Sequence, residues 1–153
     1  KGVTNFHMHF VGDGEDYNYL TDLCRQLKVE DLVTFEGRWE QQKIYSLLAN
    51  YDLFIQPSRN EGFGLTIAEA MAAKVPVLVS DIPAPMEVID DGRLGLSFEN
   101  ENPADCAEKL LFFIRKGRNK EQVEDAYQYV KSHYDVSVTA LKYLEVYESI
   151  FKK

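Results

Sequence analysis

The chain has 153 residues, a length that suits one domain with a substantial buried core. Hydrophobic residues make up 45% of the sequence and aromatic residues 12%, which excludes a disordered or collagen-like chain. The 17 Lys and Arg residues against 25 Asp and Glu residues give a net charge of −8, which disfavours binding to nucleic acid, and no apolar run approaches the roughly 20 residues of a membrane span. Cys24 and Cys106 are too few for a disulfide scaffold and lie in helical patterns, so we expect reduced, buried thiols. These features predict a soluble, cytoplasmic domain.

Short apolar strands alternate with longer helical patterns along the chain. In chain order the pattern predicts a strand at 6–11, a helix at 16–28, a strand at 32–35, a helix at 41–49, a strand at 52–56, a helix at 64–73, strands at 75–80 and 95–98, and helices at 103–116, 121–133 and 136–151. Such alternation favours a parallel sheet with helices on both faces. No repeat, linker or low-complexity segment divides the sequence, so we predict a single α/β domain over 1–153.

Polar and glycine-rich loops follow the first four predicted strands. They cover residues 12–14, 37–39, 58–64 and 80–81. Because the carboxyl ends of parallel strands meet at one edge of a sheet, and ligands bind there, we expect these loops to form a ligand-binding edge. Loops of this kind are commonly rich in glycine and polar residues even without a ligand, so one such loop alone has an ordinary structural explanation.

The third of these loops has three features that favour a ligand. Gly62, Phe63 and Gly64 lead directly into a helix, whose N-terminal N–H groups and partial positive charge suit a phosphate. Glu61 precedes that helix and Glu69 lies within it, and sugar hydroxyls are natural partners for carboxylates beside a phosphate. Glu69 also stands in an otherwise apolar stretch, where a carboxylate is costly unless it is hydrogen-bonded. A surface glutamate on an amphipathic helix is the alternative explanation for Glu69.

Other chemistries find little support in the sequence. His7 and His9 share one face of the first predicted strand, a spacing that can bind a metal, but no third ligand is evident, so we expect two structural histidines. The sequence has no Gly-x-Ser-x-Gly elbow, no Walker A motif and no complete dinucleotide fingerprint. Acyl, ATP and NAD chemistry are therefore disfavoured.

Seven short motifs stand in order along the chain. They are Val11-Gly12-Asp13-Gly14, Val33-Thr34-Phe35-Glu36-Gly37, Pro57-Ser58, Glu61-Gly62-Phe63-Gly64-Leu65, Glu69-Ala70-Met71-Ala72, Pro76-Val77-Leu78-Val79-Ser80-Asp81 and Glu87-Val88-Ile89. This series resembles the C-terminal, donor-binding half of GT-B glycosyltransferases, in particular the retaining enzymes of glycosyltransferase family 4 (glycosyl transferases group 1), over about residues 5–147. The paired glutamates around Gly-Phe-Gly are the specific part of the pattern. The resemblance implies a Rossmann-like parallel sheet, the C-terminal half of a GT-B fold.

The resemblance implies a role for each carboxylate of the third loop and its helix. Glu61 would be the catalytic residue that faces the transferred hexose, positioning the sugar rather than attacking it, and Glu69 would accept hydrogen bonds from the donor ribose. The other implied donor-binding residues are Gly12, Gly37, Arg38, Gly62, Phe63, Gly64 and Leu65. Backbone N–H groups of Phe63, Gly64 and Leu65 would contact the diphosphate and the sugar, and the loop at 37–39 would flank the nucleobase.

Two departures from the family pattern lead to further expectations. Lys74 occupies a turn position where family members usually have glycine, so either its φ is positive or the turn differs. A strand, an Arg and a Lys that grip the diphosphate, and the N-terminal acceptor domain are missing, so we interpret the chain as an N-terminally truncated fragment of a two-domain enzyme. Residues 1–3 would then be the tail of a helix, and the strands at 6–11 and 52–56 would each lose a neighbour. Unpaired edges recruit partners, so we expect strand exchange or a homodimer.

By resemblance, the complete enzyme moves a hexose from a UDP-, GDP- or ADP-linked donor to a saccharide or lipid acceptor with retention of configuration. No metal or other cofactor is expected, because the family generally needs none and no Asp-x-Asp motif is present. The implied context is polysaccharide or lipopolysaccharide biosynthesis, in the cytoplasm or at the periphery of the inner membrane, with any membrane contact in the missing half. A GT-B-type sugar-nucleotide epimerase and a non-catalytic nucleotide- or sugar-binding module stay open as alternatives.

Overall fold

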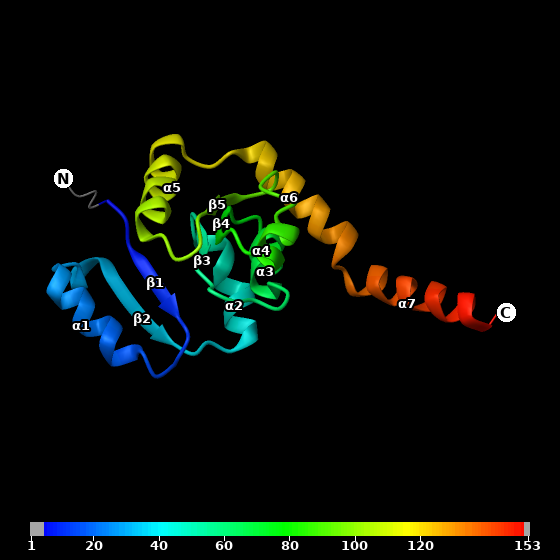
Figure 1. Cartoon of the computed structure of the whole chain (residues 1–153), viewed down its shortest axis with the longest axis horizontal. Helices are drawn as coiled ribbons and strands as arrows, with labels where there is room; N and C mark the ends of the chain where they lie inside the picture. Colours follow the sequence, from blue (N-terminus) through cyan, green and yellow to red (C-terminus); the bar gives the residue numbers. More distant parts are fainter. Residues whose placement is uncertain (1–4, 152–153) are drawn as a thin grey trace. The chain divides into compact units, whose positions relative to one another are not determined.

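The computed structural model describes residues 5–151, which belong to two units, Lys1–Ser46 and Leu47–Lys153 (Figure 1). The helix tail expected at residues 1–3 lies outside the described residues. Every helix and strand predicted from the sequence is present, with bounds that differ by a few residues at most. No helix among residues 5–151 combines the length and the hydrophobicity that crossing a bilayer requires.

The first unit is a strand–helix–strand arrangement. Its elements are β1 (Met8–Val11), α1 (Tyr17–Leu27), a 3₁₀ turn η1 (Glu30–Leu32) and β2 (Val33–Gly37), and α2 (Gln41–Leu47) begins in it. β1 and β2 pair in parallel, with a register shift between Phe10 and Val11. The Phe35 ring stacks on Phe10 at 5.2 Å and meets the edge of Tyr17 at 5.5 Å. No described residue of this unit is fully buried, so partly exposed aromatic rings hold its layers together.

The second unit contains a three-stranded parallel sheet in the order β3-β4-β5. Its elements are η2 (Leu48–Asn50), β3 (Phe54–Gln56), α3 (Leu65–Ala72), β4 (Val77–Ser80), α4 (Pro83–Val88), β5 (Leu96–Phe98), α5 (Pro103–Lys116), α6 (Lys120–His133) and α7 (Val136–Phe151). Because the strands are parallel, the loops after β3 and β4 leave the sheet at the same edge. The α/β fold class with parallel strands and flanking helices is confirmed.

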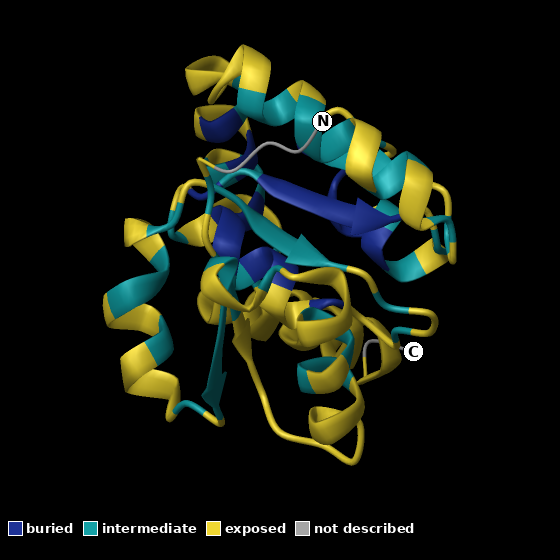
Figure 2. Ribbon diagram, turned by 90° about the vertical axis from the view of Figure 1, so that its left-hand side faces the viewer, coloured by how far each residue is buried: buried dark blue, intermediate teal, exposed yellow. Residues whose placement is uncertain are grey.

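The core of the second unit lies around the central strand and α3. All four residues of β4 are buried, as a strand covered on both faces requires (Figure 2). α6 packs against α3, and its buried Ala126 and Val130, four residues apart on one helix face, belong to the same core cluster as the buried side chains of α3. The core therefore fixes the position of α3, the helix that follows the third loop.

Some local predictions are confirmed and others are wrong. Lys74 has a φ of 59°, so the turn before β4 keeps the left-handed geometry that a glycine would adopt there. The Lys74 ammonium pairs with Glu124 at 2.7 Å and lies 4.4 Å from the centre of the Tyr127 ring. Cys24 and Cys106 are free thiols, as expected, but both are half-buried rather than buried.

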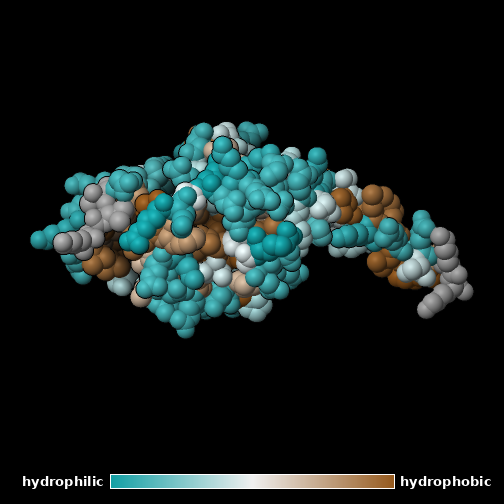
Figure 3. Space-filling view, turned by 90° about the horizontal axis from the view of Figure 1, so that it is seen from above, coloured by the Kyte–Doolittle hydropathy of each residue, from teal (hydrophilic) through white to brown (hydrophobic). Residues whose placement is uncertain are grey.

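Strand edges and one helix face remain uncovered in residues 5–151. β1 pairs with β2 alone and β3 with β4 alone, so each of these strands has one edge without a hydrogen-bonded neighbour. α7 buries none of its described side chains and exposes apolar residues along its length (Figure 3). They include Leu141, Tyr143, Leu144, Tyr147, Ile150 and Phe151. An exposed apolar surface of this kind is typical of an interaction surface.

Adding one methyl group at Gly95 is expected to destabilise the second unit. Gly95 is buried, and a Cβ there would lie 2.6 Å from Val77 Cγ2 and 3.1 Å from Ile89 Cγ2. Gly95→Ala is therefore expected to lower the free energy of unfolding by about 1–3 kcal/mol, the usual cost of overpacking a core. Chemical denaturation measures the change, with Gly14→Ala as control because a Cβ at Gly14 meets no atom within 4 Å. Equal effects of the two substitutions would contradict this packing argument.

Candidate functional site

The turn between β3 and α3 leads into a helix whose first residues, Leu65 and Thr66, are exposed, whereas the preceding Gly64 is buried. Gly64 is the N-cap residue and has a φ of 86°, a conformation that favours glycine. Its carbonyl accepts hydrogen bonds from Ile67 N at 3.0 Å and Ala68 N at 3.3 Å, which closes the first turn. No side chain among residues 5–151 caps this helix with a hydrogen bond. The N–H groups at the start of α3 therefore suit an anionic group.

Side-chain space at position 64 is also tight. A Cβ there would lie 3.0 Å from Ile67 Cδ1 and 3.5 Å from Val88 Cγ2, both in the core. The backbone at the start of α3 thus rests directly on the packed core. A ligand approaching from the other side would meet backbone rather than a side chain of residue 64.

Glu61 is half-buried and held from two directions. Its Oε2 accepts a hydrogen bond from Gln56 Nε2 at 2.6 Å, and its Oε1 accepts one from the backbone N–H of Gly62 at 3.1 Å. Gln56 in turn accepts a hydrogen bond from the Thr66 hydroxyl. The carboxylate predicted to be catalytic is therefore fixed beside the exposed start of α3.

A second contact fixes the base of the same loop. Ser80, at the carboxyl end of β4, is fully buried, and its hydroxyl donates to the Ser58 carbonyl at 2.6 Å. The backbone N–H of Asp81 donates to the Phe98 carbonyl at 2.9 Å, and Asp81 Oδ1 accepts from Asn100 N at 2.7 Å. The loops after β3 and β4 thus meet at one sheet edge, as predicted for this pair.

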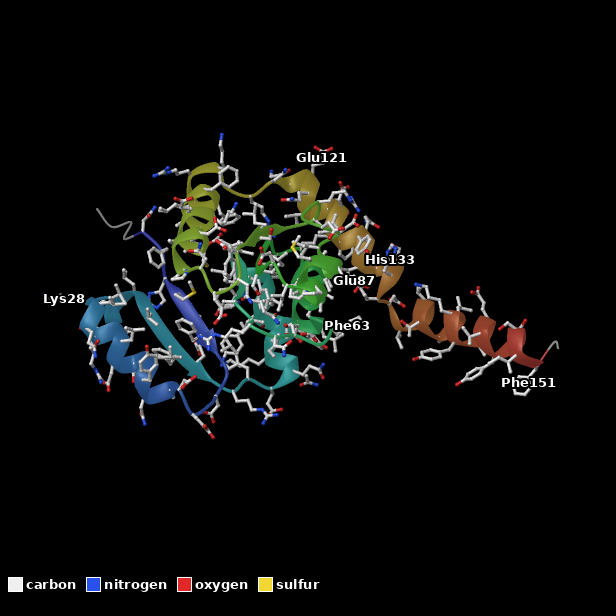
Figure 4. The ribbon with its side chains drawn as sticks, viewed as in Figure 1. Lys28, Phe63, Glu87, Glu121, His133 and Phe151 are labelled. Atoms are coloured by element: carbon white, nitrogen blue, oxygen red, sulfur yellow. The ribbon has the colours of Figure 1, made fainter. Side chains whose placement is uncertain are left out.

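Two further residues of the predicted donor site, Glu69 and Phe63, lie on either side of the helix start and differ in burial. Glu69 lies on α3 between the buried Ala68 and Ala70 and is itself half-buried, which disfavours the alternative of a fully solvated surface glutamate. The Phe63 side chain, labelled in Figure 4, is exposed. Its ring meets the ring of Tyr134, the C-cap residue of α6, edge-on at 5.5 Å. Burial raises the pKa of the Tyr134 hydroxyl. The Phe63 side chain is therefore occupied by a contact with Tyr134, and the backbone role that the resemblance implies for Phe63 stays a prediction.

In the first unit a backbone hydrogen bond joins two of the predicted loops. The N–H of Gly12 donates to the Gly37 carbonyl at 2.8 Å, and both glycines have a positive φ. Arg38 is exposed next to this contact, and Trp39 lies under the Lys43 ammonium, 4.1 Å from its ring centre. The carboxyl ends of β1 and β2 therefore lie together, as the parallel pairing predicts.

The two strand histidines have protein partners. His7 Nε2 lies 2.8 Å from Thr34 Oγ1, and His9 Nδ1 lies 2.9 Å from Glu36 Oε1. Among the residues that the structure describes, no group of three or more His, Cys, Asp or Glu side chains could hold a metal ion. These contacts support the prediction of two structural histidines.

Glu36 is expected to make the stability of the first unit depend on pH. Its hydrogen bond to His9, together with the Lys43 ammonium, holds the pKa of Glu36 below the ordinary value of 4.5. Because the folded-state pKa is lowered, the ionised carboxylate stabilises the fold above pH 4.5, and this contribution disappears as the pH falls through the lowered pKa. Glu36→Gln should therefore flatten the loss of melting temperature between pH 6 and pH 3. Glu30→Gln, a carboxylate outside this pair, is the control, and identical profiles for Glu36→Gln and the unmodified protein would contradict the account.

The fold and the β3–α3 loop define a class of protein. The fold of this chain is shared by its structural neighbours, the GT-B glycosyltransferases. The sequence model of the family "Glycosyl transferases group 1" matches residues 1–133. The chain therefore belongs to this glycosyltransferase family, and the resemblance stated from its motifs is confirmed.

Individual relatives agree with this assignment. The O-antigen biosynthesis glycosyltransferase WclY of Escherichia coli is 29% identical over 144 residues, which cover 94% of this chain and 39% of WclY. A glycosyltransferase of Rickettsia africae superimposes with a TM-score of 0.86 at 27% identity, over 97% of this chain and 41% of that one. Anabaena Alr3699/HepE, solved in complex with UDP-glucose, gives a TM-score of 0.82 at 26% identity, over 94% and 41% of the two chains. The chain thus spans about two fifths of the length of these relatives.

Proposed function

We propose that this chain supplies the donor site of a retaining glycosyltransferase, which transfers a hexose from a nucleotide-sugar to an acceptor hydroxyl. The single observation that carries the proposal is the exposed start of α3, with glycine at its N-cap and Glu61 held beside it. Membership of the family and the UDP-glucose complex of a relative support a nucleoside diphosphate sugar as the ligand. UDP-glucose is accordingly the first donor to test, before GDP- and ADP-linked sugars.

In this proposal the start of α3 binds the donor diphosphate. The N–H groups of Phe63, Gly64 and Leu65 donate to phosphate oxygens, and the helix dipole favours the negative charge that grows as the diphosphate leaves. Glu69 accepts hydrogen bonds from the ribose hydroxyls. In the first unit, the loops with Gly12, Gly37 and Arg38 remain the predicted contacts of the nucleotide.

The transfer step needs no nucleophile from the protein. The bond between the sugar C1 and the diphosphate oxygen breaks, the acceptor hydroxyl oxygen bonds to C1 on the same face, and its proton passes to the departing phosphate. Glu61 accepts a hydrogen bond on each carboxylate oxygen, an arrangement that suits positioning of the sugar better than attack on it. Catalysis then depends on orientation and on stabilising the leaving charge.

The complete enzyme extends the proposal beyond this chain. A saccharide or lipid-linked acceptor would bind to a further domain, in the assembly of O-antigen or another cell-surface polysaccharide, on the cytoplasmic side or at the periphery of the inner membrane. Turnover would need no divalent metal. The open edges of β1 and β3 would be covered by further chain or by a second copy.

A stereochemical assay tests the proposed reaction in the intact enzyme. The anomeric proton coupling of the product, read by NMR with UDP-glucose as donor, is expected to show the same anomeric configuration as the donor. Turnover should persist in excess EDTA. An inverted product would contradict retention, and loss of turnover restored by Mg²⁺ would contradict metal independence.

A further inference from the structure

Gln56, the last residue of β3, connects three parts of the proposed donor site. Its Nε2 donates to Glu61 Oε2 at 2.6 Å and to Ser58 Oγ at 3.3 Å, and its Oε1 accepts from the Thr66 hydroxyl. Because a carboxylate accepts but does not donate, the amide nitrogen of Gln56 must face Glu61, which directs the amide oxygen toward Thr66. One side chain thereby links the end of a strand, the loop and the first turn of α3.

We propose that Gln56 is a positioning residue that fixes the Glu61 carboxylate toward the sugar of the donor. The proposal rests on the proposed function of Glu61. Gln56 holds Oε2, and the Gly62 N–H holds Oε1 at 3.1 Å, so rotation of the carboxylate would break both hydrogen bonds. Each oxygen can accept more than one hydrogen bond, so both keep capacity for a sugar hydroxyl. A fixed carboxylate meets the sugar without first losing rotational freedom.

The amide group suits this position better than its closest replacements. Glutamate at position 56 would place a second carboxylate beside Glu61, where like charges repel. Methionine has a similar length but offers no hydrogen-bond donor, and it would leave the half-buried Glu61 Oε2 without this partner. Gln56→Met therefore removes the hydrogen bonds of Gln56 with little change of volume.

The first part of the test needs no ligand. In the intact protein, labelling glutamate carbonyl carbons with ¹³C and glycine nitrogens with ¹⁵N selects the amides that follow a glutamate, which in this chain are Gly37 and Gly62. Gln56→Met is expected to shift the Gly62 amide proton upfield and to speed its exchange, while Gly37 stays unchanged. The control is Gln122→Met, which removes an amide that donates to the Arg93 carbonyl at 3.0 Å and should leave Gly62 unchanged. An unmoved Gly62 signal in Gln56→Met overturns the proposal.

The second part compares affinities for UDP-glucose and UDP by calorimetry. Gln56→Met is expected to weaken UDP-glucose binding about tenfold while UDP binding stays the same, as Glu61→Ala should also do. The proposal is overturned if Gln56→Met leaves the ratio of the two affinities intact while Glu61→Ala changes it. If Glu61→Ala itself leaves the ratio intact, the sugar-facing role of Glu61 is wrong and Gln56 has no sugar to position. The Gly62 amide signal distinguishes the two failures. It still moves in Gln56→Met if only the sugar-facing role of Glu61 is wrong, and it stays unmoved if Gln56 does not hold the Glu61 carboxylate.

A second variant covers the case in which Gln56→Met does not fold. Thr66→Val removes the hydroxyl that fixes the amide oxygen of Gln56. It should shift Gly62 in the same direction by a smaller amount, and Thr66→Ser should restore the original signal. Failure of Thr66→Ser to restore the Gly62 signal overturns the proposal.

Discussion

Replacing Glu61 with alanine is expected to lower kcat of the intact enzyme by about a hundredfold, the scale on which misplacing a substrate slows catalysis. Affinity for UDP should fall by less than about threefold, because in the proposed site the diphosphate is held by backbone N–H groups at the start of α3. Gln56 and the backbone N–H of Gly62 together hold the half-buried Glu61 carboxylate in place. Steady-state kinetics with UDP inhibition separates the two effects.

Two matched variants sharpen the Glu61 experiment. Glu61→Gln keeps one acceptor oxygen and the size of the side chain but removes its charge. Its kcat should therefore lie between those of the unmodified enzyme and Glu61→Ala. Glu108→Ala removes an exposed carboxylate from α5 and should change neither parameter. Equal losses of kcat and UDP affinity in Glu61→Ala would contradict a position facing the sugar.

Replacing Glu69 with alanine is expected to weaken UDP binding by about tenfold to a hundredfold. This range corresponds to about 1–3 kcal/mol, the usual value of hydrogen bonds to a charged group. Glu69 is half-buried between two buried alanines of α3, so the core fixes the helix backbone at this position. Calorimetric titration of the intact protein measures the effect.

A modified nucleotide separates the ribose contact from a change in fold. UDP lacking the 2′ and 3′ hydroxyls offers no ribose donor to Glu69, so Glu69→Ala should leave its affinity almost unchanged. Combining Glu69→Ala with the modified nucleotide should therefore weaken binding little more than either change alone. Additive losses would show that Glu69 acts elsewhere than on the ribose.

Periodicity was enough to predict the longest helices, α1, α5, α6 and α7, because each has at least 11 residues in which a helical repeat can show. The helix predicted at 103–116 has those bounds in the structure, where the Asn102 side chain caps its N-terminus by accepting from Ala104 N and Asp105 N. α4 was not predicted, because its six residues include two prolines and are too short to show a helical period. The positive φ at Lys74 was one of the two predicted outcomes, because this lysine stands at a turn position where family members usually have glycine.

The site was predictable where its chemistry lies within a few consecutive residues. The consecutive residues Gly62, Phe63 and Gly64 were enough to predict a helix N-terminus. The hydrogen bond from Thr66 to Gln56 spans ten residues and that from Ser80 to Ser58 spans 22, so both depend on how the strands and α3 pack. The sequence signal that could have identified Gln56 was its position as a polar residue at the end of the apolar strand β3.

The most direct test of the donor site is a nucleotide titration of the intact protein, followed by the amide resonances of this chain. UDP, GDP and ADP at millimolar concentrations make even a binding free energy near −4 kcal/mol visible. One nucleotide, expected to be UDP, should shift the amides from Gly62 to Glu69 and those near Gly12 and Gly37, and leave α7 unchanged. Shifts elsewhere, or none with all three nucleotides, would contradict the proposal that this chain binds the donor.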